Sequence, residues 1–150
     1  MADGLLKSVK KLGIRYNSIK MNIVGMNINT FEAKVILGLK VGYSEELITL
    51  NQVKSAIREI APTIEGYTFS GTLTPGEIIV AGKNEYQEPC ILITTSIYPR
   101  FPQEKTKFKK EFIEFIGKLA EELKQERIGI TFTDESLMIE TKYCKHPDIK

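Results

Sequence analysis

Tryptophan is absent from this 150-residue sequence, which holds a single histidine and two cysteines. Cys90 and Cys144 lie far apart and form no C-x-x-C pair, so a disulfide framework is excluded and a reducing compartment is favoured. No apolar run approaches the ~18 residues needed to span a bilayer, and the first residues lack the apolar core of a secretory signal. We therefore expect a cytoplasmic protein without a transmembrane segment.

The usual catalytic and cofactor motifs are also missing. His146 is the only histidine, so a Ser-His-Asp or Cys-His mechanism depends on this one residue. With Cys144 it supplies two metal ligands, and no second pair of ligands accompanies them. The glycines form neither the P-loop nor the dinucleotide-binding fingerprint. The sequence thus predicts no metal and no cofactor.

Positive charge gathers at the start of the chain. Residues 1–22 contain five lysines or arginines against one acidic residue, Asp3, whereas the rest of the chain is mildly acidic. Apolar residues recur in this leader at steps of four and three, a pattern typical of one helical face: Leu5, Val9, Leu12, Tyr16 and Ile19. We interpret residues 1–27 as a basic amphipathic helix followed by a linker.

The leader is open to several interpretations. Its apolar residues Leu5, Val9, Leu12 and Tyr16 are candidates for binding a protein partner or for self-association. Contact with an anionic membrane surface is a weaker alternative, and a helix packed on its own domain or a frayed end is the simplest explanation. We expect a homo-oligomer. We expect no nucleic-acid partner, because the domain is mildly acidic and lacks the stacking aromatics of RNA-binding sheets.

A clean alternation marks the first strand of the domain. From Phe31 to Tyr43, the odd-numbered residues are apolar and the even-numbered residues are mostly charged or glycine, with Ile36 the exception. Because successive side chains of a strand point to opposite faces, this pattern predicts one core face and one mixed face.

Two helices are expected next to strands. Thr49 and Gln52 have the spacing of a capping box, and the apolar residues from Leu50 to Ile60 form a helical stripe that Pro62 limits. The second helix is predicted from Thr106 to Gln125, where one face is apolar: Phe108, Phe112, Phe115, Ile116, Leu119 and Leu123.

The remaining strands are short. Residues 66–73 and 78–81 are predicted as two arms joined by a type II turn at Pro75-Gly76, and residues 90–98, 128–133 and 137–143 as further strands. The order strand-helix-strand-strand-helix-strand indicates an α+β domain of the ferredoxin-like, split β-α-β type, with both helices on one face of an antiparallel sheet. The domain is expected over residues 28–145, with a flexible tail at 146–150.

Two clusters at predicted strand ends are candidates for ligand binding. Tyr43, Ser44 and Glu45 follow the first strand, where a solvated loop is the simpler explanation. Thr95, Tyr98 and Arg100 end a hydroxyl-rich strand, where tyrosine and arginine are suited to a carboxylate or phosphate. A threonine-rich strand with a surface arginine is the simpler explanation there.

Residues 36–140 resemble a family of small uncharacterised bacterial proteins with a ferredoxin-like core. The likeness lies in Gly42, in Pro62 followed by Gly66-Tyr67-Thr68, in Gly71 and Gly76, in the apolar strand Ile91–Thr94, and in Gln125-Glu126. The resemblance implies the topology and no activity.

Two functional hypotheses follow. The first is a non-enzymatic binding module that self-associates through its open sheet face and binds a protein or a small polar ligand. The apolar stripe of the leader and Ile36 on the otherwise mixed face favour it. The alternative is a small ferredoxin-like enzyme that uses Tyr43, Glu45, Tyr98 and Arg100 in a pocket at the sheet end.

Overall fold

The computed structural model describes residues 14–16, 19–23, 27–42 and 44–145. Two short strands come first, and a mixed α and β segment follows. The elements are β1 (Ile14–Tyr16), β2 (Ile19–Met21), β3 (Glu32–Gly38), α2 (Leu50–Ile60), the 3-10 turn η1 (Ala61–Thr63), β4 (Thr72–Val80), β5 (Tyr86–Ser96), α3 (Lys105–Glu122), β6 (Arg127–Phe132) and β7 (Ser136–Glu140).

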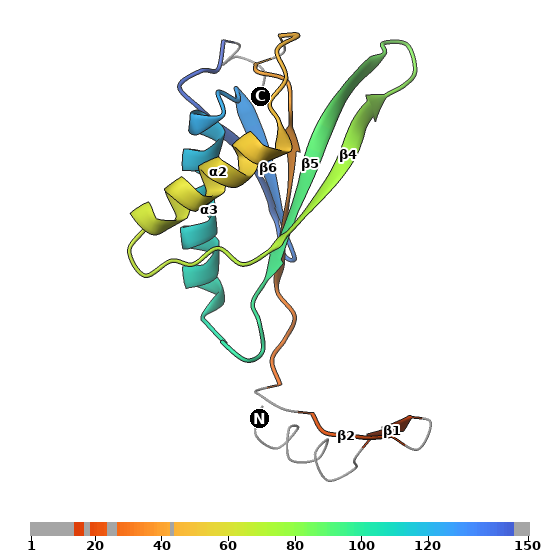
Figure 1. The fold of residues 1–150 in the computed structure, drawn as a ribbon, viewed down its shortest axis with the longest axis vertical. Helices are drawn as coiled ribbons and strands as arrows, with labels where there is room; N and C mark the ends of the chain where they lie inside the picture. Colours follow the sequence, from red (N-terminus) through yellow and green to blue (C-terminus); the bar gives the residue numbers. More distant parts are fainter. Residues whose placement is uncertain (1–13, 17–18, 24–26, 43, 146–150) are drawn as a thin grey trace.

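A five-stranded antiparallel sheet forms the body of the molecule, with strand order β4-β5-β3-β6-β7 (Figure 1). β3 lies in the centre and pairs with β5 through seven residues, from Glu32 opposite Ser96 to Gly38 opposite Cys90. On its other side, β3 pairs with β6, with Val35 opposite Ile130. The central position explains why β3 has the clearest alternation in the sequence.

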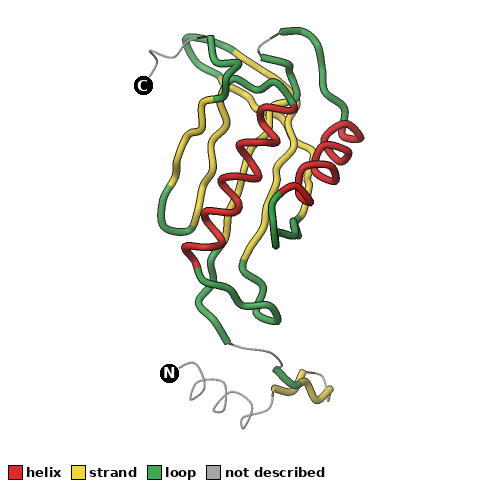
Figure 2. The backbone as a smooth tube through the Cα atoms, turned by 90° about the vertical axis from the view of Figure 1, so that its left-hand side faces the viewer, coloured by secondary structure: helices red, strands yellow, loops and turns green. Residues whose placement is uncertain are grey.

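Both helices lie on the same face of this sheet (Figure 2). α2 begins at a complete capping box, in which the Thr49 amide donates to Gln52 Oε1 at 2.7 Å and the Gln52 amide donates to Thr49 Oγ1 at 3.1 Å. α3 buries the expected apolar face, with Phe112 and Phe115 almost fully enclosed. The sequence predictions of both helices are therefore confirmed.

A single apolar core fills the space between the helices and the sheet. Its sheet side consists of alternate residues of β3, β5 and β6, and its helix side consists of the inward stripes of α2 and α3. Aromatic rings connect the two sides in edge-to-face pairs. The ring centres of Phe112 and Phe132 are 6.2 Å apart, and those of Phe31 and Phe108 are 5.7 Å apart. The opposite face of the sheet carries no helix in the part of the chain that is described.

Two local predictions are wrong. Within the described residues, Ile14–Tyr16 and Ile19–Met21 are paired strands where a helix was expected, consistent with the β-branched isoleucines that begin each. The other predicted partner residues of the leader, Leu5, Val9 and Leu12, lie outside the described residues. Pro75-Gly76 forms no turn: β4 runs straight through it, because an edge strand tolerates a proline that donates no ladder hydrogen bond.

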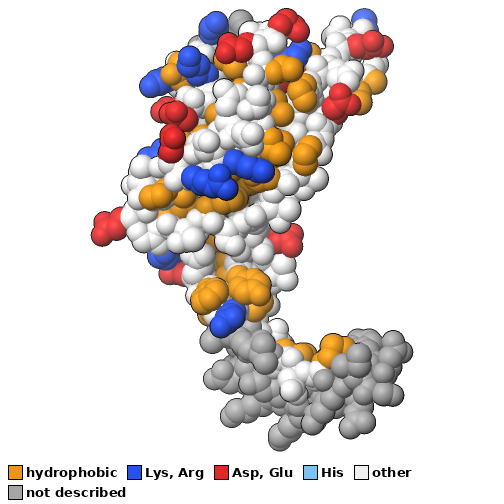
Figure 3. Space-filling view, viewed as in Figure 1, with side chains coloured by type: hydrophobic (Ala, Val, Ile, Leu, Met, Phe, Trp, Pro, Cys, Tyr) orange, Lys and Arg blue, Asp and Glu red, His pale blue; other side chains and the backbone are white. Residues whose placement is uncertain are grey.

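The surface drawn in Figure 3 carries lysine, arginine and carboxylate side chains side by side, with apolar side chains between them. Ion pairs among the described residues include Lys105 with Asp134 at 2.9 Å and the helical pair Lys118 with Glu114 at 3.3 Å. Among the helices described, none combines the length and hydrophobicity that a bilayer-crossing segment requires.

Candidate functional site

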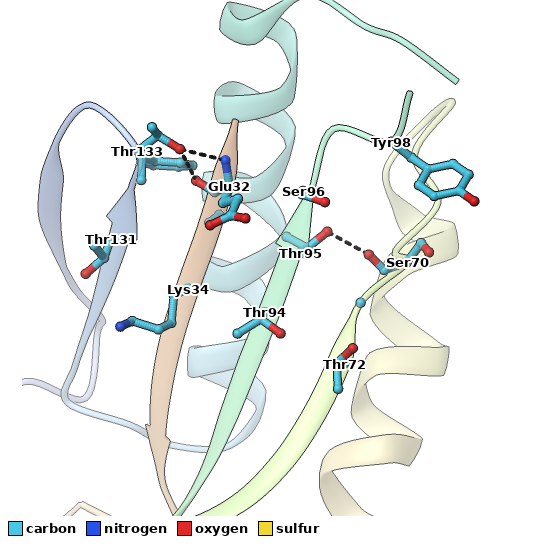
Figure 4. A pocket seen from close by; sticks show the side chains of 13 residues that line it. Glu32, Lys34, Ser70, Thr72, Thr94, Thr95, Ser96, Tyr98, Thr131 and Thr133 are labelled. Carbon is cyan, nitrogen blue, oxygen red and sulfur yellow. Dashed lines mark hydrogen bonds between the residues drawn. The ribbon is translucent and has the colours of Figure 1, made fainter. Parts of the chain in front are cut away.

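One hollow lies where β3 begins and β5 ends (Figure 4). It has a volume of about 650 Å³ and is lined by hydroxyl side chains from several strands, with Glu32 and Lys34 as its charged groups. Thr94, Lys34 and Thr131 are register partners, so their side chains lie in a row across β5, β3 and β6. This hollow suits a ligand rich in hydroxyl or amide groups.

Two of the residues predicted from the sequence line this hollow, Thr95 and Tyr98. The Thr95 hydroxyl donates to the Ser70 carbonyl at 2.6 Å, which reduces its capacity to bind a ligand. Tyr98 is largely exposed and its ring lies 6.2 Å from Phe101. The Arg100 guanidinium also lies near this ring, 5.7 Å from the centre of Phe101. The predicted tyrosine and arginine thus meet around an exposed phenylalanine.

The other predicted cluster lies at the opposite end of β3. Ser44 Oγ accepts the Glu46 amide at 3.2 Å, and Glu45 pairs with Lys40 at 3.6 Å while remaining exposed. Tyr43 lies outside the described residues. Since β3 has seven residues at roughly 3.3 Å each, the two predicted clusters are too far apart to form one pocket.

A second cavity, about 220 Å³ in volume, lies at this opposite end, on the sheet face without helices. Four polar or charged side chains are buried among the described residues, and three of them line this cavity: Glu88, Gln125 and Glu126. Carboxylates are rarely buried unless they are paired or hydrogen-bonded, so this group is more unusual than the exposed hydroxyls and is the stronger candidate for a functional site. We call it the charged cavity.

Each carboxylate of the charged cavity is held by a backbone amide. Glu88 Oε2 accepts the Lys40 amide at 3.1 Å, and Glu126 Oε1 accepts the Lys145 amide at 2.7 Å. Gln125 Nε2 donates to the Lys40 carbonyl at 3.0 Å, and this bond connects the segment after β3 to the segment after α3. These bonds fix the carboxylates in place before a ligand arrives.

Two glycines make room for these groups. A Cβ atom on Gly38 would lie 2.7 to 2.8 Å from the Glu88 carboxylate, so only glycine permits that side chain to lie flat on β3. Gly42 has a φ of 50°, a conformation that glycine adopts without strain, and it lies beside Glu126. Both glycines line the charged cavity.

The charged lining of the cavity is balanced. Two carboxylates, Glu88 and Glu126, and two cations, Lys40 and Arg127, line it. Each cation also pairs with a carboxylate outside the lining, Lys40 with Glu45 and Arg127 with Glu140.

Cys90 adjoins this region but is a poor nucleophile. It is buried two residues after Glu88 on the same strand. Burial and the Glu88 and Glu77 carboxylates raise the pKa of the Cys90 thiol, which disfavours the reactive thiolate. The chemistry of the site therefore depends on carboxylates. Among the described residues, no group of three metal-ligating side chains comes together.

Sequence reasoning missed the charged cavity. In the sequence, Glu88 and Glu126 look like ordinary surface charges, and their burial depends on glycines that lie far away along the chain. One signal was present, because Gln125-Glu126 belongs to the residues that carry the family resemblance.

Two solved structures share this fold. A phage SAM lyase in complex with S-methyl-5'-thioadenosine matches with a TM-score of 0.61 and 17% sequence identity, covering 75% of this chain and 91% of that chain. A phage SAM lyase in the apo state matches with a TM-score of 0.59 and 15% identity, covering 75% of this chain and 90% of that chain. No protein-family model and no curated protein matches the sequence.

These matches correct the functional hypothesis. The non-enzymatic binding module, and the expectation that the chain is not an enzyme, are contradicted because the solved proteins with this fold are an enzyme. The alternative of a small enzyme is the better supported hypothesis. The hypothesis had been based on the apolar stripe of the leader and on Ile36, and neither of these distinguishes a binding surface from a substrate site.

Proposed function

We propose that the chain is a small enzyme that acts on a sulfonium nucleoside of the S-adenosylmethionine class and binds its positively charged end in the charged cavity. The observation that carries this proposal is the gathering of three buried polar side chains, two of them carboxylates, in one cavity. The fold similarity to SAM lyase supports the same substrate class.

The fold itself is part of the proposal. The strand order β4-β5-β3-β6, with α2 and α3 as the two crossovers, fits the ferredoxin-like split β-α-β arrangement, to which β7 adds an edge strand. We also keep the homo-oligomer as a proposal.

The proposed reaction breaks a carbon–sulfur bond of the sulfonium. Both electrons of the bond pass to sulfur, which becomes a neutral thioether such as that of S-methyl-5'-thioadenosine. The carbon that loses sulfur then either gains an electron pair from a nucleophile or loses a neighbouring proton to a base. Glu88 and Glu126 serve to bind and orient the cationic chain, and a carboxylate of this pair is placed to accept a proton.

Loss of the sulfonium charge also affects release. The sulfonium of the substrate is attracted to the Glu88 and Glu126 carboxylates, whereas the neutral thioether of the product is not. The charged cavity is therefore expected to bind the substrate more tightly than the nucleoside product.

The test is incubation of the full chain with S-adenosylmethionine and detection of S-methyl-5'-thioadenosine by liquid chromatography and mass spectrometry. We expect cleavage by the wild type and a roughly 30-fold lower kcat/KM in Glu88→Gln and in Glu126→Gln, because each loses a buried charge worth about 2 kcal/mol to a bound cation. Glu114→Gln, on the exposed side of α3, is the matched control and should retain the wild-type rate. Absence of cleavage in the wild type overturns the proposal.

A further inference from the structure

The open face of the sheet is divided into rows that run across the strands. Register partners place Thr72, Thr94, Lys34, Thr131 and Ser136 in one polar row across all five strands. The β3–β6 pairing runs only from Ala33 to Val35, so the next residues form rows on each side of it. Thr74, Leu92 and Ile36 are register partners on one side, and Gly129 and Met138 on the other. Beyond them come Gly76, Cys90 and Gly38 on one side, and Arg127 and Glu140 on the other. Adjacent rows are about 7 Å apart.

The middle row contains a shallow apolar floor made by Ile36, Gly129 and Met138. Ile36 is 50% exposed and Met138 is 63% exposed, although both lie on the sheet and not on a loop. Gly129 is the register partner of Met138, lines the same hollow as Ile36 and contributes no side chain to it. Above this floor is a hollow of about 460 Å³. Exposed apolar side chains in a hollow are typical of a ligand site.

The apolar floor is continuous with the charged cavity. Ile36, Gly129 and Met138 line both the 460 Å³ hollow and the 220 Å³ cavity, so the two adjoin along these residues. On the other side of the floor, Lys34, Thr131 and Ser136 form a polar rim. A ligand lying along β3 and β6 would thus meet carboxylates first, then an apolar surface, then hydrogen-bonding groups.

We propose that the apolar floor is the purine subsite of this enzyme, with the adenine ring of an adenosyl sulfonium lying on Gly129 between Ile36 and Met138. This inference rests on the proposed function, since the sulfonium end then occupies the charged cavity. A purine is flat and apolar on its faces and polar at its edge, which matches a flat apolar floor bordered by hydroxyls and an ammonium. The Lys34 ammonium and the Thr131 and Ser136 hydroxyls donate to the ring nitrogens at that edge.

Two ligands separate the two ends of the site. S-methyl-5'-thioadenosine carries the purine but no charge, and S-methylmethionine carries a sulfonium and an amino acid but no purine. In calorimetric titrations of the full chain, Gly129→Val adds a side chain to the floor and should weaken binding of S-methyl-5'-thioadenosine about tenfold. It should weaken S-methylmethionine by a clearly smaller factor, because Gly129 also borders the charged cavity. Glu88→Gln should show the reverse pattern.

A second variant guards against a folding defect. Ile36→Ser removes apolar surface at an exposed position and should weaken the nucleoside in the same way as Gly129→Val. Ile79→Ser, at an isoleucine 64% exposed on β4 and outside this hollow, is the matched control and should bind both ligands as the wild type does. Thermal unfolding of each variant shows whether the fold is kept.

The outcomes distinguish this inference from the proposed function. Unchanged binding of S-methyl-5'-thioadenosine in both Gly129→Val and Ile36→Ser overturns the purine subsite, even if the wild type cleaves S-adenosylmethionine. Equal weakening of both ligands in these variants also overturns it. Nucleoside binding that depends on the apolar floor, without any cleavage, supports the subsite and overturns the proposed reaction. A wild type that binds neither ligand overturns both.

Discussion

At the scale of single residues, Gly38 decides whether the charged cavity exists. It lies opposite Cys90 in the β3–β5 ladder, and the Glu88 carboxylate occupies the space that a side chain at this position would fill. The carboxylate in turn accepts the Lys40 amide. The absence of one side chain therefore permits a buried, hydrogen-bonded charge on the face of a sheet.

Gly38→Ala is expected to destabilise the protein by about 1–3 kcal/mol, because the new methyl group displaces the Glu88 carboxylate from its hydrogen bond. The measurement is denaturant unfolding, together with kcat/KM for S-adenosylmethionine, which should also fall.

Gly117→Ala is the matched control for this substitution. Nothing lies within 4 Å of the Cβ position of Gly117, which is inside α3, so alanine there should stabilise the helix by about 1 kcal/mol. Equal effects of the two substitutions would contradict the role assigned to Gly38.

The residue scale also shows which side chains the sequence identifies and which it does not. The apolar residues of β3 and α3 were recognised as buried from their spacing. Glu88 and Glu126 were not, because both lie in polar stretches of the sequence, Gln87-Glu88 and Gln125-Glu126-Arg127, where charged side chains are expected at the surface. Their burial arises from contacts with Gly38 and Gly42, which the local sequence around each glutamate does not contain.

At the scale of elements, ion pairs connect the start of α3 to the turn between β6 and β7. Lys105 and Lys109 from the helix both reach Asp134, and Lys109 also pairs with Glu135. The two lysines lie over aromatic rings of the core, Lys105 over Phe31 and Lys109 over Phe132. This network connects the helix layer to the edge of the sheet.

Acid should weaken this connection. The hydrogen bond from Lys105, with that from Lys109, lowers the pKa of Asp134 below its ordinary value of 3.8. A carboxyl whose pKa is lower in the folded state contributes stability above pH 3.8 and loses it as the pH falls through the folded value. Asp134→Asn should therefore lower the denaturant midpoint at pH 7, with the difference from wild type vanishing in strong acid.

Salt provides the control for the Asp134 prediction. These groups are partly exposed, so about 1 M NaCl, where the Debye length is about 3 Å, should reduce the difference between Asp134→Asn and wild type at pH 7. A difference that persists unchanged at low pH would show that the asparagine acts by another route.

The helices and strands were predicted correctly where the pattern of neighbouring residues was sufficient to define them. The helices were found because a period near 3.6 and a capping box are properties of neighbouring residues. The turn at Pro75-Gly76 was predicted wrongly because the same dipeptide fits an edge strand. Only the pairing of Pro75 with Ile91 shows that β4 lies at an edge and continues.

At the scale of the whole molecule, β1 and β2 pair with each other and form a sheet separate from the five-stranded one (Figure 1). The domain was predicted to begin at residue 28, and Ile28 packs against the core. The division between leader and domain thus remains a prediction that a deletion can test.

Deletion of residues 1–27 should leave the thermal midpoint and the far-ultraviolet circular dichroism of the domain unchanged, because the core is built from residues that follow. Light scattering on both proteins measures the number of chains per particle. A lower midpoint would contradict the predicted boundary. A loss of association on deletion would show that the leader carries the homo-oligomer interface, and equal particle masses would assign that interface to the domain.

The sequence by itself determined the α+β class, the positions of α2 and α3 and the core face of β3, because these follow from periods of 3.6 and 2 among near neighbours. The tertiary structure alone decided where the functional groups meet. It separated Glu45 from Tyr98 by the length of β3, and it brought Glu88 and Glu126 together in one cavity. The physical reason is that such a site depends on which strands pair and in which register, and register is a property of the whole sheet.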